Sequence, residues 1–252
     1  GMNAMNLDTV TGSVLGVIGR RPSVRHQASV TDKILAFLTD AGLPISEDIR
    51  VYRNADQAER HADGLIAAGY RLFGPYPLRE GRFPPQAQLV PSSLWRSLNS
   101  KANLGQLVPS QYLSPRWMWH EGEVPELPAD GVYLKYGGTE ATGNGLCVRY
   151  CRDTDSFARA LDWFQAEGCA DHLVVEQAID TDIVWCANVS VTETGCHFLG
   201  AAEQLLDAPG QQSGSMIDPN FPFPQSGIDL VIHISEVARA RGFLGIAGFD
   251  IG

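Results

Sequence analysis

Hydrophobic and polar residues follow first a strand-like and then a helix-like pattern near the start of the chain. Ser13–Gly19 (SVLGVIG) is a short apolar run that ends in glycine, which is typical of a strand. Residues 28–42 (ASVTDKILAFLTDAG) have apolar positions at helical spacing, with Thr31 as a candidate N-cap and Gly42 as the expected stop. The same order then repeats, with a predicted strand, helix and strand at Ile49–Tyr52, 55–69 and 70–77. This alternation predicts an α/β unit with a parallel sheet up to about residue 90.

The pattern changes after residues 74–86 (GPYPLREGRFPPQ), a segment rich in proline and glycine that indicates a linker or an exposed loop. Helical spacing recurs in three later segments, at 92–108, 155–167 and 229–242. Strand-like runs are more numerous, and they occupy residues 131–138, 172–179, 183–191, 196–206 and 243–252. Because strands and helices no longer alternate strictly, we expect an α+β arrangement in this part of the chain.

Composition and charge narrow the class of protein. The formal net charge of -10 argues against a nucleic acid as partner, because nucleic-acid binding depends mainly on a cationic surface. A small anion held by local cations is compatible with this charge. No apolar run approaches the roughly 18 residues that indicate a membrane span, so we expect no membrane association. The five cysteines include no CxxC pair and are typical of reduced thiols, which, with an N-terminus that lacks a signal-peptide pattern, indicates a cytoplasmic protein.

Residues 132–150 (VYLKYGGTEATGNGLCVRY) place a lysine at the end of an apolar run and directly before a glycine-rich loop. The ammonium group of Lys135 is a compact charge that suits phosphate oxygens, and glycines allow backbone amides to close over those oxygens. The alternative for this stretch alone is a solvated hairpin with an exposed lysine. The interpretation therefore depends on what surrounds it in the chain.

Three other segments, one before this loop and two after it, carry further candidate residues. A second lysine, Lys101, begins the predicted helical segment SKANLG upstream, VVEQAI carries Glu176 downstream, and GFDI carries Asp250 near the end of the chain. A lysine, a second lysine before a glycine-rich loop, a VVEQ-type hinge and a terminal G-x-D-I strand occur in this order in the ATP-grasp superfamily. The chain from Ser92 to Gly252 resembles that superfamily.

The resemblance implies a fold, a domain organisation and a pair of cofactors. Residues 1–91 would form an α/β domain with a parallel sheet, of the kind that precedes ATP-grasp modules. Residues 92–172 would form the ATP-grasp subdomain with the phosphate-binding lysines, and residues 173–252 the subdomain with the adenine hinge and the metal strand. ATP and Mg2+ are the implied cofactors, with ATP held between the two α+β subdomains.

The resemblance also assigns ATP contacts to individual residues. The implied contacts are Lys101, Lys135, Gly137, Gly138, Gly143, Gly145, Glu176, Gln177, Ile179 and Asp182. The two lysines would bind phosphates, and residues 137–145 would fold over them as a lid that is poorly ordered without nucleotide. Glu176 can accept a hydrogen bond from the adenine amine, and Ile179 can cover the ring. Asp182 resembles the ribose-binding acid of the family, and Asp180 is the other candidate for that position.

Asp250 resembles the first magnesium-binding carboxylate of the family. Magnesium prefers oxygen ligands, which are commonly one or two carboxylates and the phosphates of ATP. The family's second carboxylate and its asparagine usually follow on the next strand, and this sequence stops at Gly252 before such a motif. We expect that the chain is a fragment of a longer protein, with an incomplete metal site as the alternative.

Two further side chains are candidates for catalysis. Glu203 lies with Gln204 in a segment (GAAEQLL) that resembles the acceptor side of the family's site, and it could reach the substrate or the metal. The alternative for Glu203 is a strand end that leads into a polar loop. Arg149 could assist an anionic substrate or transition state, and its alternative is a cross-strand surface charge.

The predicted function is an ATP- and magnesium-dependent ligase that joins a carboxylate to an amine through an acyl phosphate. An ATP-grasp kinase and a nucleotide-binding module without catalysis are the alternatives. The expected partners are ATP and small-molecule carboxylate and amine substrates. The sequence does not name those substrates, and it leaves the oligomeric state open, a homodimer included.

Overall fold

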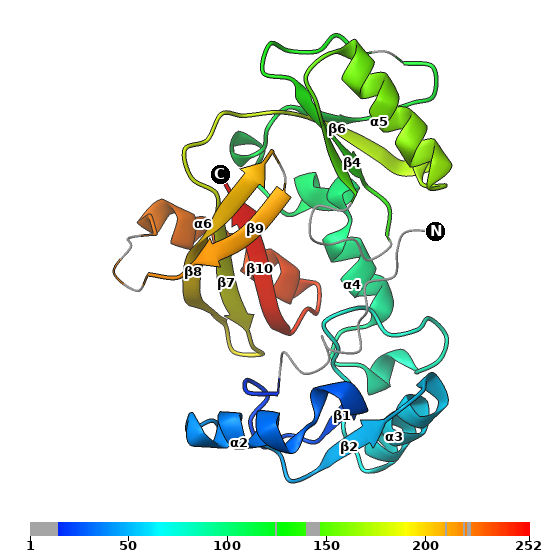
Figure 1. The fold of residues 1–252 in the computed structure, drawn as a ribbon, viewed down its shortest axis with the longest axis vertical. Helices are drawn as coiled ribbons and strands as arrows, with labels where there is room; N and C mark the ends of the chain where they lie inside the picture. The colour runs from blue at the N-terminus through cyan, green and yellow to red at the C-terminus, as the bar shows by residue number, and fades with distance from the viewer. Residues whose placement is uncertain (1–14, 124, 140–146, 210, 219, 221–222) are drawn as a thin grey trace. The chain divides into compact units, whose positions relative to one another are not determined.

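The computed structural model describes residues 15–123, 125–139, 147–209, 211–218, 220 and 223–252. These residues form two compact units. The first contains the described residues up to Phe73 together with Gln86–Gln88, and it is mostly blue and cyan in Figure 1. The second contains Gly74–Pro85 and Leu89–Gly252. No described helix is both long and apolar enough to cross a membrane.

The first unit is a small α/β arrangement, as the alternating pattern predicts. Its helices and strands are β1 (Ser23–His26), η1 (Gln27–Ser29), α2 (Asp32–Asp40), β2 (Ile49–Tyr52) and α3 (Ala55–Ala67). The strands β1 and β2 pair in parallel. The predicted N-cap is confirmed, because the side chain of Thr31 accepts a hydrogen bond from the amide of Ile34 at 3.2 Å. Asn54 caps α3 in the same way.

Two strands predicted for this unit are wrong. The described part of the first apolar run, residues 15–19, forms turns, and the strand begins only at Ser23. Leu15 from that run is nevertheless buried, so its hydrophobic character reflects packing and not strand pairing. Residues 70–77 form no strand, and they contribute one isolated parallel bridge, between Leu72 and Gln88. The two prolines of this segment lack the N–H groups that a strand would donate.

The second unit contains an antiparallel sheet that carries the glycine-loop lysine. Its strands are β3 (Arg116–Met118), β4 (Val132–Tyr136), β5 (Val148–Cys151) and β6 (Leu173–Gln177), in the order β3-β6-β4-β5. The helix α5 (Thr154–Ala166) covers one face, and Phe157 and Phe164 pack there with Leu134 and Val175. Burial alternates along β4, so its remaining side chains point to the opposite face of the sheet.

A second antiparallel sheet lies in the same unit. Its strands are β7 (Trp185–Val191), β8 (Cys196–Ala208), β9 (Gln211–Met216) and β10 (Gly245–Ile251), in the order β10-β7-β8-β9. Helix α6 (Gln225–Ala240) packs on this sheet through Val231 and Ala238, and α4 (Ser92–Asn99) adds partly buried leucines to the same core. The fold class predicted from the sequence is therefore confirmed: a unit with a parallel sheet precedes an α+β part with antiparallel sheets.

Local interruptions distinguish the structure from the predicted segments. The predicted helix over 92–108 divides at Ser100, whose backbone is extended (φ -68°, ψ 121°), into α4 and the 3-10 helix η3 (Lys101–Gln106). Strand β9 has a polar sequence, QQSGSM, without strand-like alternation, so its pairing with β8 has no hydrophobic signal. The other short 3-10 helices are η2 (Pro85–Ala87), η4 (Ser110–Tyr112) and η5 (Ala170–His172).

Gly131, directly before β4, gives a test of the sheet's packing. Its φ is +77°, and an added Cβ would lie 2.6 Å from the carbonyl oxygen of Cys151 on β5. Gly168 is a matched control, because its φ is +69° and no atom lies within 4 Å of an added Cβ. We expect Gly168→Ala to lower the free energy of unfolding by about 1 kcal/mol through backbone strain alone. Gly131→Ala should cost roughly 1 to 3 kcal/mol more through the collision. Equal losses in urea denaturation would contradict this account.

Candidate functional site

The candidate site begins on the face of the first antiparallel sheet that does not carry α5. Leu134 points toward α5, so its neighbours Tyr133 and Lys135 point the other way. The strand register pairs Tyr133 with Glu176 of β6, and Glu176 in turn with Arg116 of β3. Residues directly opposite each other in a sheet share a face. Lys135, Glu176 and Arg116 therefore lie together on the face of the sheet opposite α5.

The carboxylate of Glu176 is held between two cations. Lys135 Nζ donates a hydrogen bond to Glu176 Oε1, and Arg116 Nη1 lies 3.2 Å from Glu176 Oε2. The three side chains are 14% (Arg116), 17% (Glu176) and 22% (Lys135) exposed. Partial burial strengthens these ion pairs and also makes the loss of one partner costly. The aromatic ring of Tyr133 lies 5.3 Å from Lys135 Nζ and adds a cation–π contact.

Lys101 is brought to the same place by backbone contacts around it. Ser100 Oγ donates a 2.6 Å hydrogen bond to the carbonyl of Gly137, at the end of β4. Arg116 Nη2 donates a 2.5 Å hydrogen bond to the carbonyl of Lys101 itself. Burial lowers the pKa of Lys101, and the neighbouring charge of Lys135 lowers it further. Lys101 and Lys135, two of the three lysines in the sequence, are thus close enough to repel each other.

The first two glycines of the loop after β4 have a packing role. An added Cβ at Gly137 would lie 2.7 Å from Val174 Cγ2, and one at Gly138 would collide with the Tyr136 hydroxyl. The amide of Gly137 donates a 2.6 Å hydrogen bond to the carbonyl of His172. These glycines therefore allow the end of β4 to stay close to its neighbours. The rest of the predicted phosphate lid from residue 140 to residue 145, which includes Gly143 and Gly145, lies outside the described residues.

The predicted adenine hinge comprises the last residues of β6 and those directly after it. The amide of Gln177 donates to the carbonyl of Pro115 at 2.9 Å, and the amide of Ala178 donates to that of Gly131 at 3.0 Å. Because these two amides already donate to backbone carbonyls of the protein, the next backbone amide that could donate to a ligand is that of Ile179. The Ile179 side chain is 55% exposed and is accessible to a planar ligand. Asp180 and Asp182 are both exposed, so the structure leaves both candidates for a sugar hydroxyl in place.

The second sheet contributes Asp250. This residue lies on β10, and Gln204 of β8 donates a hydrogen bond from Nε2 to Asp250 Oδ1. The charge of Asp250 raises the pKa of Lys101, though less than burial lowers it, so the carboxylate lies within electrostatic reach of Lys101. Among the described residues, no group of three or more histidine, cysteine, aspartate or glutamate side chains could hold a metal ion.

Two family models match most of the chain. A model described as the L-aspartate--L-methionine ligase N-terminal domain matches residues 1–96. A model described as L-aspartate--L-methionine ligase, ATP grasp, matches residues 116–252, which is more than half of the chain. The chain belongs to this ATP-grasp family. The resemblance on which the sequence analysis relied is therefore confirmed.

Solved structures support the fold of this family member at low sequence identity. The biotin carboxylase domain of 2-oxoglutarate carboxylase from Hydrogenobacter thermophilus matches with a TM-score of 0.61 and 12% identity over 97% of this chain and 58% of that one. The L-amino acid ligase from Bacillus licheniformis matches with a TM-score of 0.52 and 14% identity over 92% and 63%. Biotin carboxylase from Campylobacter jejuni matches with a TM-score of 0.56 and 12% identity, over 95% of this chain and 58% of that one. The chain thus spans less than two thirds of each of these structures.

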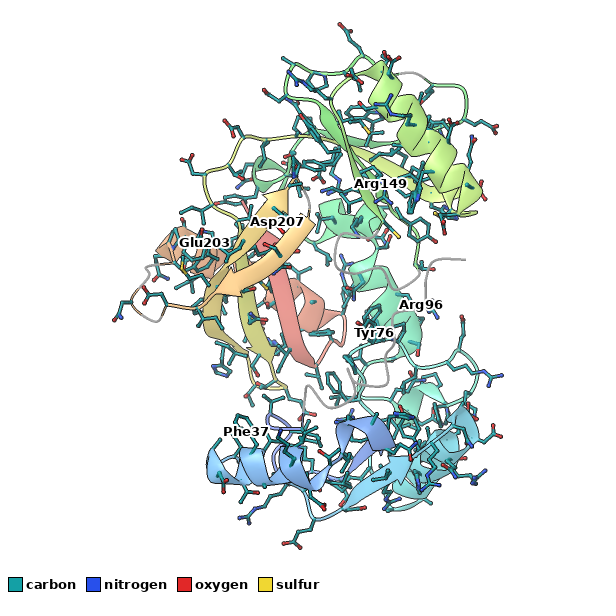
Figure 2. All side chains as sticks on the ribbon, in the orientation of Figure 1. Phe37, Tyr76, Arg96, Arg149, Glu203 and Asp207 are labelled. Carbon is teal, nitrogen blue, oxygen red and sulfur yellow. The ribbon has the colours of Figure 1, made fainter. Side chains whose placement is uncertain are left out.

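The two candidate catalytic residues lie apart from the lysine cluster. Arg149 pairs across the sheet with Leu134, and its guanidinium lies 3.7 Å from the ring centroid of Trp163 on α5. Figure 2 labels Arg149 at the sheet that carries α5. It is therefore on the face opposite Lys135. Glu203 precedes Gln204 on β8, so the two side chains point to opposite faces of that sheet, and Glu203 does not share the face of Asp250.

Arg116 is the site residue that sequence reasoning missed in this family member. The segment that contains it, PRWMWH, reads as a short aromatic-rich stretch, and nothing in its spacing points to a nucleotide. Its role becomes visible only because β3 pairs with β6 and places Arg116 directly opposite Glu176. The two residues are 60 positions apart in the chain, which no local pattern can connect.

Ser100 gives a test of how the loop and Lys101 are held together. Ser100→Ala removes a buried hydrogen bond and leaves the Gly137 carbonyl without that donor, so we expect a loss of about 1 to 3 kcal/mol in unfolding free energy. Hydrogen exchange at the Gly137 amide, which bonds His172, should accelerate as well. Ser93→Ala is the matched control, because Ser93 is exposed on α4 and should change stability by less than about 0.5 kcal/mol. Unchanged exchange at Gly137 in Ser100→Ala would contradict the proposed link.

Proposed function

We propose that this chain binds ATP on the face of β4 and β6 opposite α5 and takes part in ATP-dependent ligation of a carboxylate to an amine. The observation that carries the proposal is the convergence of Lys101, Arg116 and Lys135 around one carboxylate, Glu176. Three cations gather here in a protein whose formal net charge is -10, and the carboxylate of Asp250 is also within electrostatic reach of Lys101. The negatively charged oxygens of a polyphosphate suit such a group of cations.

The relatives support this proposal and suggest the substrates to test first. The structure from Hydrogenobacter thermophilus is described in complex with MgADP, ADP and bicarbonate. The family models are named for L-aspartate--L-methionine ligase, and the structure from Bacillus licheniformis for L-amino acid ligase. L-aspartate as the carboxylate and L-methionine as the amine are therefore the first pair of substrates that we propose.

In this proposal, one group of residues binds the phosphates of the nucleotide and another binds its base and ribose. Lys135 exchanges its ion pair with Glu176 for a phosphate oxygen, and Lys101 binds a second phosphate oxygen. The loop glycines Gly137, Gly138, Gly143 and Gly145 cover the phosphates. Glu176 accepts from the adenine amine, with the Gln177 carbonyl and the Ile179 amide alongside, and Asp182 accepts from the ribose hydroxyls. The committed amides of Gln177 and Ala178 support the choice of Ile179 as donor.

The proposed chemistry has two steps. A carboxylate oxygen of the substrate attacks the γ-phosphorus, the bond between that phosphorus and the bridging oxygen breaks, and ADP leaves. The amine nitrogen then attacks the acyl carbon of the resulting acyl phosphate, phosphate leaves, and the nitrogen loses a proton. The side chains of Lys101 and Lys135 neutralise the negative charge that develops on the phosphoryl oxygens during the first step.

Asp250 is the described residue that fits a magnesium ion in this proposal. Its carboxylate is exposed, and the amide of Gln204 fixes it through a hydrogen bond to one oxygen. Magnesium is commonly held by one or two carboxylates and the phosphates of ATP, where it screens phosphate charge. In this proposal Glu203 and Arg149 act structurally, because Arg149 stacks on Trp163 and Glu203 points away from Asp250.

Product analysis tests the function directly. With ATP, Mg2+, L-aspartate and L-methionine, we expect ADP, phosphate and a dipeptide in equal amounts. ADP together with a phosphorylated amino acid and no dipeptide would indicate the kinase alternative. ATP binding without turnover would favour a binding module.

Calorimetry of Lys135→Ala should show a loss of about 1 to 3 kcal/mol in the free energy of ATP binding. Lys33→Ala, which removes an exposed lysine of α2 in the first unit, should bind like wild type.

Lysine acetylation gives an independent test of where the nucleotide binds. The chain has only three lysines, so each can be followed by mass spectrometry. The lowered pKa of Lys101 increases its neutral, nucleophilic fraction at mildly alkaline pH. We expect ATP to slow acetylation of Lys101 and Lys135 and to leave the rate at Lys33 unchanged. Equal protection of all three lysines, or of none, would contradict the assigned phosphate contacts.

A further inference from the structure

Arg116 contacts both parts of the proposed nucleotide site. Its Nη1 lies 3.2 Å from Glu176 Oε2, and its Nη2 donates a 2.5 Å hydrogen bond to the carbonyl of Lys101. It is also the least exposed of the three charged side chains in the ion cluster. A guanidinium group has a planar fork of donors, so it can hold two acceptors in a fixed relation. Arg116 therefore connects the hinge carboxylate to the segment that carries Lys101.

The ion cluster must rearrange when a polyphosphate arrives. Lys135 and Arg116 both pair with Glu176 in the structure. Of these two cations, only Lys135 is assigned to a phosphate in the proposed function. When Lys135 turns to a phosphate, Glu176 Oε1 loses its partner and becomes an open acceptor. Arg116 then remains as the cation beside Glu176. Arg116 Nη1 makes no aligned hydrogen bond within the described part of the chain, so it has a donor to offer the carboxylate as that group reorients.

A carboxylate fixed in this way distinguishes nucleobases. Adenine presents an exocyclic amine, which donates a hydrogen bond to the open oxygen of Glu176. Guanine presents a carbonyl oxygen at the same ring position, which cannot donate and would face a negative charge. A carboxylate that could swing toward the phosphates or into water would lose this discrimination, because an unfixed polar group can find another partner.

We propose that Arg116 is the positioning residue that holds Glu176 for base recognition once Lys135 has moved to the phosphates, and thereby makes the site selective for adenine over guanine. This inference rests on the proposed ATP site and identifies what fixes its selectivity. The hydrogen bond from Arg116 Nη2 to the Lys101 carbonyl orients the guanidinium group beside Glu176.

Binding of three probes separates positioning from direct phosphate binding. We would measure the dissociation constants of ATP, GTP and inorganic tripolyphosphate for wild type and Arg116→Gln by calorimetry. We expect Arg116→Gln to weaken ATP binding by at least about tenfold and GTP binding by less than about threefold, so that the ATP/GTP preference falls. Tripolyphosphate affinity should stay within about twofold of wild type. An equal loss for ATP and tripolyphosphate would make Arg116 a phosphate ligand and overturn the proposal.

A double-mutant cycle shows whether Arg116 acts through Glu176. Glu176→Gln should itself reduce the ATP/GTP preference, and adding Arg116→Gln to it should reduce that preference no further. Independent, additive effects of the two substitutions on the preference would overturn the proposal. Arg116→Lys keeps the charge but loses the fork, and the preference should lie between those of wild type and Arg116→Gln. If Arg116→Gln does not fold, Arg116→Lys takes its place in the same cycle.

A control variant and measurements on wild type distinguish the role of Arg116 from ATP binding itself. Arg159→Gln is the charge-matched control, because Arg159 is exposed on α5, and its ATP/GTP preference should equal that of wild type. If wild type binds ATP and Lys135→Ala weakens it, but Arg116→Gln keeps the wild-type preference, only the role of Arg116 is overturned. If wild type binds no ATP, both the function and this inference are overturned.

Discussion

A one-residue slip between β4 and β6 would turn Lys135 away from Glu176 and toward the apolar side of the sheet, because neighbouring strand residues point to opposite faces. Hydrophobic burial opposes such a slip. Leu134 and Val175 face each other across the two strands and are fully buried beneath α5. Exposing one such side chain costs about 1.5 to 3 kcal/mol. The apolar face of the sheet therefore fixes the register, and the register gathers the charges on the other face.

The charged side chains on the face opposite α5 favour the binding of an anion. Burial and, after it, repulsion from Lys135 lower the pKa of Lys101, which means that the folded protein holds this cation at a cost. Glu176 offsets part of that cost through its ion pairs with Lys135 and Arg116. A polyphosphate would offset more of it, and it would compete with Glu176 for Lys135. The same ion cluster can therefore stabilise the ligand-free protein and direct the exchange that nucleotide binding requires.

Local signals predicted most elements of the fold, and the failures have physical reasons. Thr31 caps its helix as expected, since an N-cap depends only on residues within one turn. The predicted strand at residues 70–77 fails, because its prolines cannot donate to a ladder. Strand β9 escapes prediction because its polar residues pair through the backbone, without an apolar face that a pattern could reveal. The cap and the prolines act within their own segments, whereas the pairing of β9 was decided by a strand elsewhere in the chain.

The sequence by itself determined most of the helices and strands, the α/β and α+β parts, and the ATP-grasp character of the chain. Those properties depend on hydrophobic spacing and on short motifs, which need no partner to be read. Only the tertiary structure decided that Arg116 joins Glu176, that Gln204 and not Glu203 contacts Asp250, and that Arg149 stacks on Trp163. Each of these follows from the face on which a strand residue points and from the strand that pairs beside it. That information resides in contacts between distant segments, because burying one face of a sheet is what selects its register.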